Sequence, residues 1–273
     1  MKITVILTCF NRKDKTMDCV KRLIEGNNKI DFDFVIVDDG STDGTEKALT
    51  ESAYANSVKI IKTAGNCYYS GGMHLGMQYV LQSGRKADYL LMVNDDVLFY
   101  NEAIEKLIKQ SQQKNDSVVV GVTCDEQGTQ TYGAVKYLGG FSVRYRAVKL
   151  GEVIECDTFN ANCVLIPYNY FEKTGAMDDH YIHSLGDFDY GLSLKRNGAQ
   201  LYSSEHYVGI CKRNSTKGTW LDKSLPLKKR MELKETVKGA PAKQWFYFLK
   251  KNFGMGKALV FTVTPYINLI LGR

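Results

Sequence analysis

Two pairs of neighbouring aspartates, Asp38-Asp39 and Asp95-Asp96, lie 57 positions apart in the first hundred residues. Each pair follows a short apolar run, at residues 34–37 and 89–93. Short continuous apolar runs predict buried parallel strands, and open α/β sheets bind ligands beyond the carboxyl ends of such strands. The sequence therefore predicts four carboxylates at one rim of a sheet. A divalent cation there would offset their mutual repulsion.

The elements that must position these aspartates alternate along the chain. Apolar runs predict strands at residues 3–8, 34–37, 58–62, 89–93 and 118–122. Helical patterns separate them at residues 15–24, 46–52, 72–82 and 102–113. Alternation of this kind predicts right-handed parallel βαβ units. We therefore expect an α/β fold with a Rossmann-like, mainly parallel sheet flanked by helices.

The alternation breaks after about residue 124. Residues 128–150 are rich in Gly, Tyr and basic side chains and predict irregular structure or a hairpin. A strand, two helices and a last strand are then expected at residues 163–166, 170–174, 188–196 and 200–202. We expect one domain over residues 1–215, with a first half at about 1–100 and a second half at about 101–215.

Composition narrows the class of protein. An apolar fraction of 44% is typical of a globular chain and excludes a disordered one. The 7 cysteines include no Cys-x-x-Cys pair, which speaks against a disulfide scaffold or a zinc ribbon. The first residues have too short an apolar run for a signal peptide. These features predict a cytoplasmic protein.

The carboxyl-terminal region is strongly basic. Residues 212–273 carry 14 Lys and Arg against three acidic residues, a net charge of +11, whereas the whole chain carries +6. Aromatic residues are interleaved at 245–253, and the apolar stretch at 258–271 is shorter than the roughly 20 residues that span a bilayer. We expect residues 216–273 to form a basic amphipathic helical extension. It either lies on an anionic membrane surface, at the inner face of the plasma membrane, or folds back on the domain. Nucleic acid is not an expected partner, because no recognition motif accompanies the charge.

Four short segments carry a family resemblance. They are Thr8-Cys9-Phe10-Asn11-Arg12, Val37 to Asp43, Asn94-Asp95-Asp96-Val97 and Gly186-Asp187-Phe188-Asp189-Tyr190. In order and spacing they resemble family 2 glycosyltransferases of the GT-A fold, over roughly residues 1–215. The resemblance implies a GT-A nucleotide-sugar-binding fold.

The resemblance also implies a binding site for a nucleotide sugar and Mg²⁺ or Mn²⁺. Asp96 is expected to contact the metal, Asn94 and Asp95 to take ribose or supporting roles, and Asp39 to contact the nucleobase. Asn94 departs from the Asp-x-Asp form of the family motif. A turn with a helix N-cap is the alternative explanation of the segment at 94–96. The expected walls of the nucleotide pocket are Thr8, Cys9, Phe10, Asn11, Arg12, Gly65, Asn66, Gly71 and Gly72.

Glycosyl transfer also needs a base for the incoming hydroxyl group. The resemblance assigns this role to Asp187, with Asp189 as the second candidate; an N-cap role for Asp187 is the alternative. His183 is expected in the acceptor cleft. His206 is a candidate third metal ligand, with a surface histidine as the alternative. Lys212-Arg213-Asn214 is a candidate clamp on the diphosphate or, equally, a solvated loop.

The resemblance therefore implies a metal-dependent inverting glycosyltransferase of cell-surface polysaccharide biosynthesis. A UDP- or dTDP-sugar would be the donor, and a saccharide or lipid-linked saccharide the acceptor. One alternative is a sugar-phosphate nucleotidyltransferase, although the Gly-rich basic loop that it needs after the first strand is missing from residues 8–15. The other is a catalytically inactive, membrane-associated module that binds nucleotide sugars.

Overall fold

The computed structural model describes residues 1–152 and 154–272. Its main feature is an eight-stranded sheet in the order β3-β2-β1-β4-β10-β6-β11-β5. These strands are β1 (Lys2–Cys9), β2 (Asp31–Asp38), β3 (Val58–Lys62), β4 (Tyr89–Val93), β5 (Leu98–Phe99), β6 (Val118–Cys124), β10 (Cys163–Pro167) and β11 (Leu201–Ile210).

The order and direction of the strands confirm the predicted α/β fold. β1 pairs in parallel with β2 and with β4, and β2 pairs in parallel with β3. β10 is antiparallel to both neighbours, and the short β5 is antiparallel to β11. The sheet is therefore mixed but mainly parallel, and the carboxyl ends of β1, β2 and β4 share one rim.

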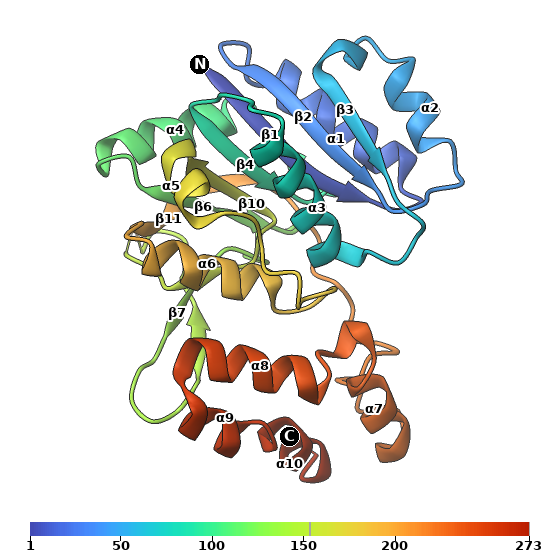
Figure 1. Cartoon of the computed structure of the whole chain (residues 1–273), viewed down its shortest axis with the longest axis vertical. Helices are drawn as coiled ribbons and strands as arrows, with labels where there is room; N and C mark the ends of the chain where they lie inside the picture. Colours follow the sequence, from blue (N-terminus) through green and yellow to red (C-terminus); the bar gives the residue numbers. More distant parts are fainter. Residues whose placement is uncertain (153, 273) are drawn as a thin grey trace.

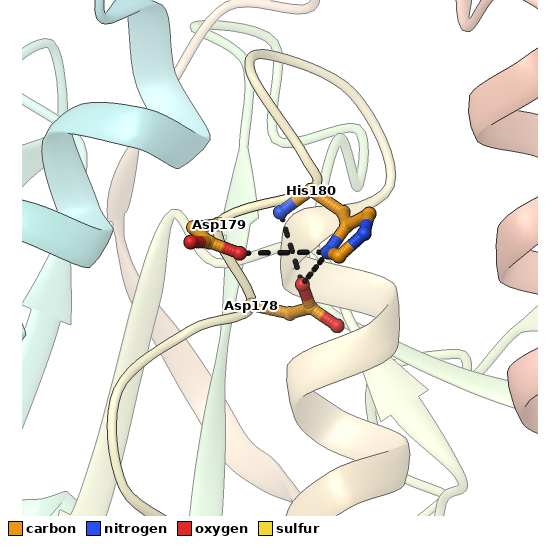
Figure 2. A group of neighbouring side chains, drawn as sticks. All are labelled: Asp178, Asp179 and His180. Carbon is orange, nitrogen blue, oxygen red and sulfur yellow. Dashed lines mark hydrogen bonds and ion pairs between the residues drawn. The ribbon is translucent and has the colours of Figure 1, made fainter.

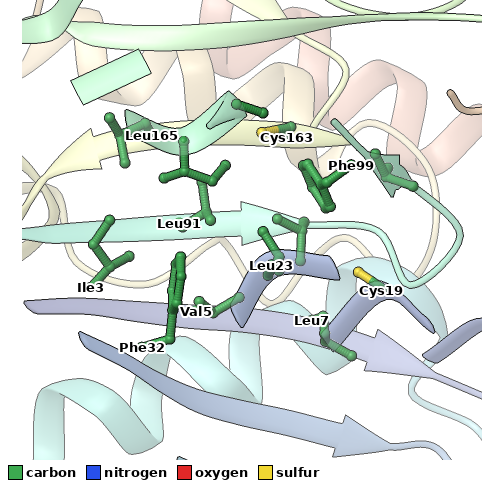
Figure 3. Packing of buried hydrophobic residues seen from close by; sticks show 14 of the residues in the cluster. Ile3, Val5, Leu7, Cys19, Leu23, Phe32, Leu91, Phe99, Cys163 and Leu165 are labelled. Carbon is green, nitrogen blue, oxygen red and sulfur yellow. The ribbon is translucent and has the colours of Figure 1, made fainter. Parts of the chain in front are cut away.

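Helices cover both faces of this sheet (Figure 1). They are α1 (Lys13–Glu25), α2 (Thr45–Thr50), the 3-10 turn η1 (Ala55–Ser57), α3 (Tyr68–Gln82), α4 (Ala103–Gln113), α5 (Tyr168–Thr174) and α6 (Gly186–Arg196). Alternate residues of a strand point to opposite faces, so each face has its own core. Leu91 of β4 packs in one hydrophobic cluster, whereas Leu90 and Met92 pack in the other. Figure 3 shows the first cluster, where Cys19 and Leu23 of α1 lie near Val5 and Leu7 of β1.

Residues 128–150 contain the hairpin that the sequence left as one of two alternatives. β7 (Ala134–Tyr137) pairs antiparallel with β8 (Tyr145–Ala147) and with β9 (Thr158–Phe159) in a separate three-stranded sheet. Gly139 and Gly140 lie in the hairpin loop at φ of 75° and 71°, a conformation that glycine adopts without strain. The hairpin extends toward the carboxyl-terminal helices (Figure 1).

The carboxyl-terminal region is helical, as predicted. It contains α7 (Leu227–Lys234), the 3-10 turn η2 (Val237–Gly239), α8 (Ala242–Phe253), α9 (Met255–Phe261) and α10 (Thr264–Ile270). α6 lies between the sheet and α8 (Figure 1). Phe248 and Leu249 of α8 are buried in a third hydrophobic cluster with Tyr181. α8 is thus folded back on the rest of the chain. Across the described residues, 1–152 and 154–272, no helix combines the length and hydropathy needed to cross a membrane.

Two expected elements differ most from their predicted bounds. α3 begins at Tyr68, four residues before the predicted start. The last strand does not stop at Tyr202 but continues to Ile210, with irregular pairing between Ser203 and Gly209. The polar residues at 203–206 hide this continuation, because no apolar run marks it.

Candidate active site

A single cleft lies at the rim where β1, β2 and β4 end, with a cavity volume of about 810 Å³. Eleven of the predicted site residues line it: Thr8, Cys9, Phe10, Arg12, Asp39, Gly65, Asn94, Asp95, Asp96, His183 and Asp187. They come from both halves of the chain. The structure therefore brings together three of the four aspartates that the sequence placed at a common rim, whereas Asp38 is fully buried at the end of β2 and does not line the cleft.

Three hydrogen bonds fix the side chain of Asp39 in the cleft. Its Oδ1 accepts hydrogen bonds from the Thr63 hydroxyl (2.5 Å) and the Cys67 amide (3.0 Å), and its Oδ2 accepts one from the Tyr68 amide (2.8 Å). Asp39 thereby caps the amino terminus of α3, which explains the early start of that helix. A carboxylate oxygen can accept two hydrogen bonds, so Oδ2 keeps one free lone pair for a ligand N–H.

Asp95 and Asp96 share one guanidinium group. Arg12 Nη1 donates to Asp95 Oδ1 at 3.0 Å and to Asp96 Oδ2 at 3.1 Å. Asp95 is buried, and this burial raises its pKa to about 6, although the Arg12 charge opposes the rise. Arg12 thus offsets part of the repulsion between the two carboxylates.

The residues around Asp96 fit a hard divalent cation whose other coordination positions are filled by water and the substrate. Asp96 Oδ1 faces Cys211, whose Sγ lies 3.6 Å away, while Oδ2 faces Arg12. Burial raises the pKa of Cys211 to about 12, so the thiol is neutral and adds no charge. Mg²⁺ in proteins is held by one or two carboxylates, with water and substrate phosphates filling the other positions. Asp96, with Asp95 beside it, matches that donor set.

Asp187 also lines the cleft and lies in the first turn of α6. Its Oδ1 accepts a hydrogen bond from the Phe188 amide (2.8 Å) and its Oδ2 accepts one from the Ala161 amide (3.4 Å). Burial raises its pKa to about 6, despite these hydrogen bonds. A carboxyl group of this pKa can accept a proton near neutral pH.

The backbone before Asp187 is tightly constrained. Leu185 has a φ of 73°, which is uncommon for a residue with a branched side chain. A Cβ on Gly186 would lie 2.5 Å from Ser70 Oγ and 2.6 Å from Met177 Sδ. A larger side chain therefore does not fit at position 186.

Four expected pocket residues do not line the cleft. Asn11 accepts a hydrogen bond from the Thr42 amide (2.8 Å) and ties the loop after β1 to the loop after β2. Asn66 is exposed outside the cleft. Gly71 and Gly72 lie inside α3, and a Cβ on Gly72 would lie 2.6 Å from Thr8 Cγ2. Gly72 therefore lets α3 pack against β1, whereas a Cβ on Gly71 would lie 3.7 Å from Cys67 Cβ, which is an ordinary contact. Neither glycine lines the cleft, so the prediction that they wall the nucleotide pocket is wrong.

The structure also separates three charged candidates from the cleft. Asp189 is 1% exposed and faces α8, where Lys251 Nζ lies 2.6 Å from its Oδ2. Arg213 donates to the Thr131 carbonyl (2.9 Å), and its neighbours Lys212 and Asn214 line the cleft instead. His206 is exposed within β11 and borders a different depression. Asp189 is therefore not a second base, and His206 is not placed to share a metal with Asp96.

Sequence reasoning missed the aromatic part of the cleft. The lining includes Tyr68, Tyr69, Tyr132, Tyr145, Phe188, Trp245 and Phe248. The aromatic run at residues 245–253 was the available signal, but charge and hydropathy left it between a membrane surface and a helix folded back on the domain. Only the packing of α8 on α6 brings Trp245 to the cleft.

A second group of possible metal ligands lies outside the cleft, in the loop before α6 (Figure 2). Asp178, Asp179 and His180 each offer a ligand atom, and these atoms lie within 4.8 Å of one another. Asp178 already accepts hydrogen bonds from Lys251 Nζ (2.6 Å) and the Tyr247 hydroxyl (2.9 Å). Burial raises its pKa, but these hydrogen bonds outweigh the burial and lower the pKa to about 2. The group therefore joins α8 to the rest of the chain.

Comparison with known families decides the classification. Residues 4–164, more than half of the chain, match the model of glycosyl transferase family 2. The chain belongs to this family. The mixed α/β sheet and the cleft at its rim agree with the GT-A fold of family 2 glycosyltransferases.

Three curated family relatives are similar at low identity. The poly(ribitol-phosphate) β-N-acetylglucosaminyltransferase TarP of Staphylococcus aureus is 25% identical over 124 residues. The poly(ribitol-phosphate) β-glucosyltransferase of Bacillus spizizenii is 27% identical over 124 residues, and the glycosyltransferase GlyG of Streptococcus pneumoniae is 24% identical over 120 residues. Each match covers 44% of this chain and, respectively, 36%, 19% and 38% of the relative.

Solved structures confirm the fold. S. aureus TarS (residues 1–349) has a TM-score of 0.56 at 15% identity, and its complex with UDP has 0.57 at 14% identity. The mannosyltransferase PcManGT of Pyrobaculum calidifontis, in complex with GDP-Man and Mn²⁺, has a TM-score of 0.59 at 12% identity. Each comparison covers 96% of this chain and 74% of the other.

Proposed function

We propose that this chain is a metal-dependent, inverting glycosyltransferase. It would move a sugar from a nucleotide-sugar donor to a hydroxyl group of a saccharide or lipid-linked saccharide. The observation that carries the proposal is that Asp39, Asp96 and Asp187 line one cleft. The cavity, about 810 Å³, is in the range of small-molecule binding sites.

Each aspartate has a separate task in this reaction. Asp39 accepts an N–H of the nucleobase with the free lone pair of its fixed carboxylate, and Arg12 lies beside the site of the diphosphate. Asp96 would hold Mg²⁺ or Mn²⁺, which when bound would supply positive charge to stabilise the leaving diphosphate.

Asp187 acts on the acceptor. Its carboxylate takes the proton of the incoming hydroxyl group as that oxygen forms a bond to the anomeric carbon. The bond from this carbon to the diphosphate oxygen breaks, and the nucleoside diphosphate leaves with the electron pair. Attack from the side opposite the leaving group inverts the anomeric centre. The raised pKa of Asp187 favours proton transfer near neutral pH.

The family relatives and the similar structures support the proposed donor and acceptor classes. The TarS and PcManGT structures contain UDP and GDP-Man, which supports a nucleotide-sugar donor here, and we propose a UDP- or dTDP-sugar. The curated relatives named for poly(ribitol phosphate) support a role in cell-surface polysaccharide biosynthesis.

The outer surface of α9 and α10 supports a position on an anionic membrane. Six aliphatic side chains of α9, α10 and the two residues that flank α10 are each about half exposed, and we call them the α9–α10 stripe: Leu259, Val260, Val263, Ile267, Ile270 and Leu271. Residues 212–273 carry a net charge of +11, which complements anionic lipids. A short apolar stripe with flanking basic charge is typical of a helix that lies in the membrane interface.

Release of nucleoside diphosphate from a panel of nucleotide sugars, with Mn²⁺ present, tests the proposal. We expect slow hydrolysis of one donor by the wild-type protein and loss of it in Asp96→Ala. The Asp125→Ala variant, which changes an aspartate outside the cleft, is the control. Tight donor binding without release from any donor would instead identify an inactive binding module.

A further inference from the structure

The cleft has lining residues that the donor roles leave unassigned. Asp39, Arg12 and Asp96 account for the nucleotide, the diphosphate and the metal, and they lie on loops that follow β1, β2 and β4. Three large aromatic side chains of the lining come from elements other than these loops. Tyr145 comes from β8, Phe188 from α6 and Trp245 from α8. We call these three residues the aromatic wall.

The rings of the aromatic wall pack against other aromatic rings. Trp245 stacks on Phe248, with ring centroids 5.5 Å apart and an interplanar angle of 14°. Phe248 is buried, whereas Trp245 is half-buried and borders the cleft. Tyr145 is 51% exposed and packs edge-on against Phe188 at 5.1 Å. A residue that served only the core would be buried, as Phe248 is. Trp245 and Tyr145 remain partly exposed.

The polar edge of Trp245 is already satisfied. Its Nε1–H donates to the Phe261 carbonyl at 3.0 Å. The indole therefore has no hydrogen-bond donor left for a ligand, and it offers the cleft apolar, π-electron surface. The C–H face of a sugar ring carries partial positive charge, which is attracted to the negative face of an aromatic ring. The hydroxyl groups of the same sugar point outward and stay free for other contacts.

The aromatic wall is fixed relative to Asp187. Lys251 Nζ and Asn252 Nδ2 of α8 bind the buried carboxylate of Asp189 at 2.6 and 2.8 Å. Asp189 is two residues from Asp187 on the same helix. Phe188 lies between them in the sequence. The wall and the proposed base are therefore parts of one packed unit, and a ring held by the wall would be pre-positioned for the reaction.

From this arrangement we propose that the aromatic wall is the saccharide subsite of the acceptor, and that the carboxyl-terminal extension completes it through Trp245. The inference rests on the proposed function, since a hydroxyl group of the bound saccharide must face Asp187. It changes the expected role of the extension. The α9–α10 stripe remains on the outside, while α8 belongs to the active cleft.

Tryptophan fluorescence tests this assignment without requiring turnover. The chain has 2 tryptophans, so Trp245 is the only source of tryptophan fluorescence in a Trp220→Phe background. The samples contain UDP and Mn²⁺ to occupy the donor site. Cellotetraose, chitotetraose and maltotetraose are added in turn as saccharide probes. We expect at least one of these saccharides to change Trp245 emission saturably, and Tyr145→Ala in the same background to weaken its apparent affinity. Unchanged emission with all three saccharides would overturn the proposal.

Kinetics with the responding saccharide separates binding from a structural role. Trp245→Ala is expected to raise its KM about tenfold, a loss on the scale of an aromatic stacking contact, while KM for the nucleotide sugar stays at the wild-type value. Trp245→Phe should restore most of the saccharide affinity, and Trp220→Phe is the matched control outside the cleft. An equal rise of both KM values in Trp245→Ala would show a structural role and contradict the assignment. A wild-type protein that releases no nucleoside diphosphate would refute the proposed function, and the fluorescence result would still decide the saccharide subsite.

Discussion

The aspartates of the cleft have different partners, and these partners separate their roles. Asp39 is fixed by two backbone amides and a hydroxyl group, which leaves it little freedom but one open lone pair. Asp96 shares Arg12 with Asp95 and keeps one oxygen toward the cleft. Asp187 has only amide donors and no cationic partner among the hydrogen bonds and ion pairs of the described residues, so burial dominates its pKa. The first two suit binding, and the third suits proton transfer.

The pH dependence of turnover follows from Asp187. Burial raises its pKa to about 6, and only the ionised carboxylate can accept the proton of the acceptor. The rate of nucleoside diphosphate release should therefore fall as the pH drops through about 6, and level off above it. A pH–rate profile at saturating donor and Mn²⁺ measures this. A rate that stays constant between about pH 5 and about pH 8 would be inconsistent with Asp187 as the base.

Gly186 shows how a residue without a side chain can control the one beside it. Gly186→Ala would place a Cβ 2.5 Å from Ser70 Oγ, so α3 and α6 must move apart locally. We expect a loss of about 1–3 kcal/mol in the free energy of unfolding and a lower turnover rate, because Asp187 moves with the helix. Chemical denaturation measures the first effect.

Gly256→Ala is the matched control for that measurement. A Cβ at position 256 meets no atom within 4 Å, and alanine favours a helix over glycine by about 1 kcal/mol. Its free energy of unfolding should be unchanged or slightly higher. If Gly186→Ala is as stable as Gly256→Ala, the steric account of position 186 is wrong.

At the scale of elements, α6 and α8 are joined by an ion pair between the buried Asp189 and the partly exposed Lys251. Lys251 neutralises Asp189, which is 1% exposed, and also contacts Asp178 at 2.6 Å. Lys251→Met would leave a buried carboxylate without its cation, and we expect a cost of about 2–4 kcal/mol. Lys250→Met, at the exposed neighbouring position, is the control and should change stability by less than about 0.5 kcal/mol.

Adding Asp189→Asn to Lys251→Met tests the origin of that loss. Removing the charge of the partner should recover part of the stability, because the unpaired carboxylate is gone. Equal destabilisation with and without Asp189→Asn would mean that Lys251 acts through its packing and not through its charge.

Much of this arrangement is encoded locally. The apolar runs before Asp38 and Asp95 specify buried parallel strands, and strand direction alone then places both aspartate pairs at one rim. The start of α3 and the full length of β11 are not encoded by local apolar runs. α3 begins where the distant side chain of Asp39 caps it, and β11 carries polar residues at 203–206.

The position of Trp245 also depends on long-range packing. Local sequence marks residues 242–253 as an amphipathic helix but does not say which surface its aromatic face covers. That choice is made by Asp189 and Asp178, which bind Lys251 from across the molecule. The same reason explains the wrong prediction that His206 is a metal ligand. The path of β11, and not the sequence separation, sets where His206 lies relative to Asp96.

At the scale of the whole molecule, the cleft and the α9–α10 stripe lie on different parts of the carboxyl-terminal region. The protein is expected to sediment with vesicles that contain phosphatidylglycerol and not with phosphatidylcholine vesicles. Ile267→Glu combined with Leu259→Glu should abolish sedimentation, because both charges interrupt the exposed apolar stripe. Leu75→Glu, at an exposed apolar position on α3, is the control. Unchanged sedimentation of the double variant would refute this surface. Substitutions are preferable to deletion of residues 240–273, which would also remove the partner of Asp189.

The central claim is that one cleft binds the donor through Asp39 and Asp96 and activates the acceptor through Asp187. The most direct test compares donor affinity and nucleoside diphosphate release in Asp187→Asn and in the wild-type protein. We predict that Asp187→Asn binds the donor and Mn²⁺ as tightly as the wild type but releases nucleoside diphosphate about a thousandfold more slowly. Release within about tenfold of the wild-type rate, with donor binding intact, would contradict the account.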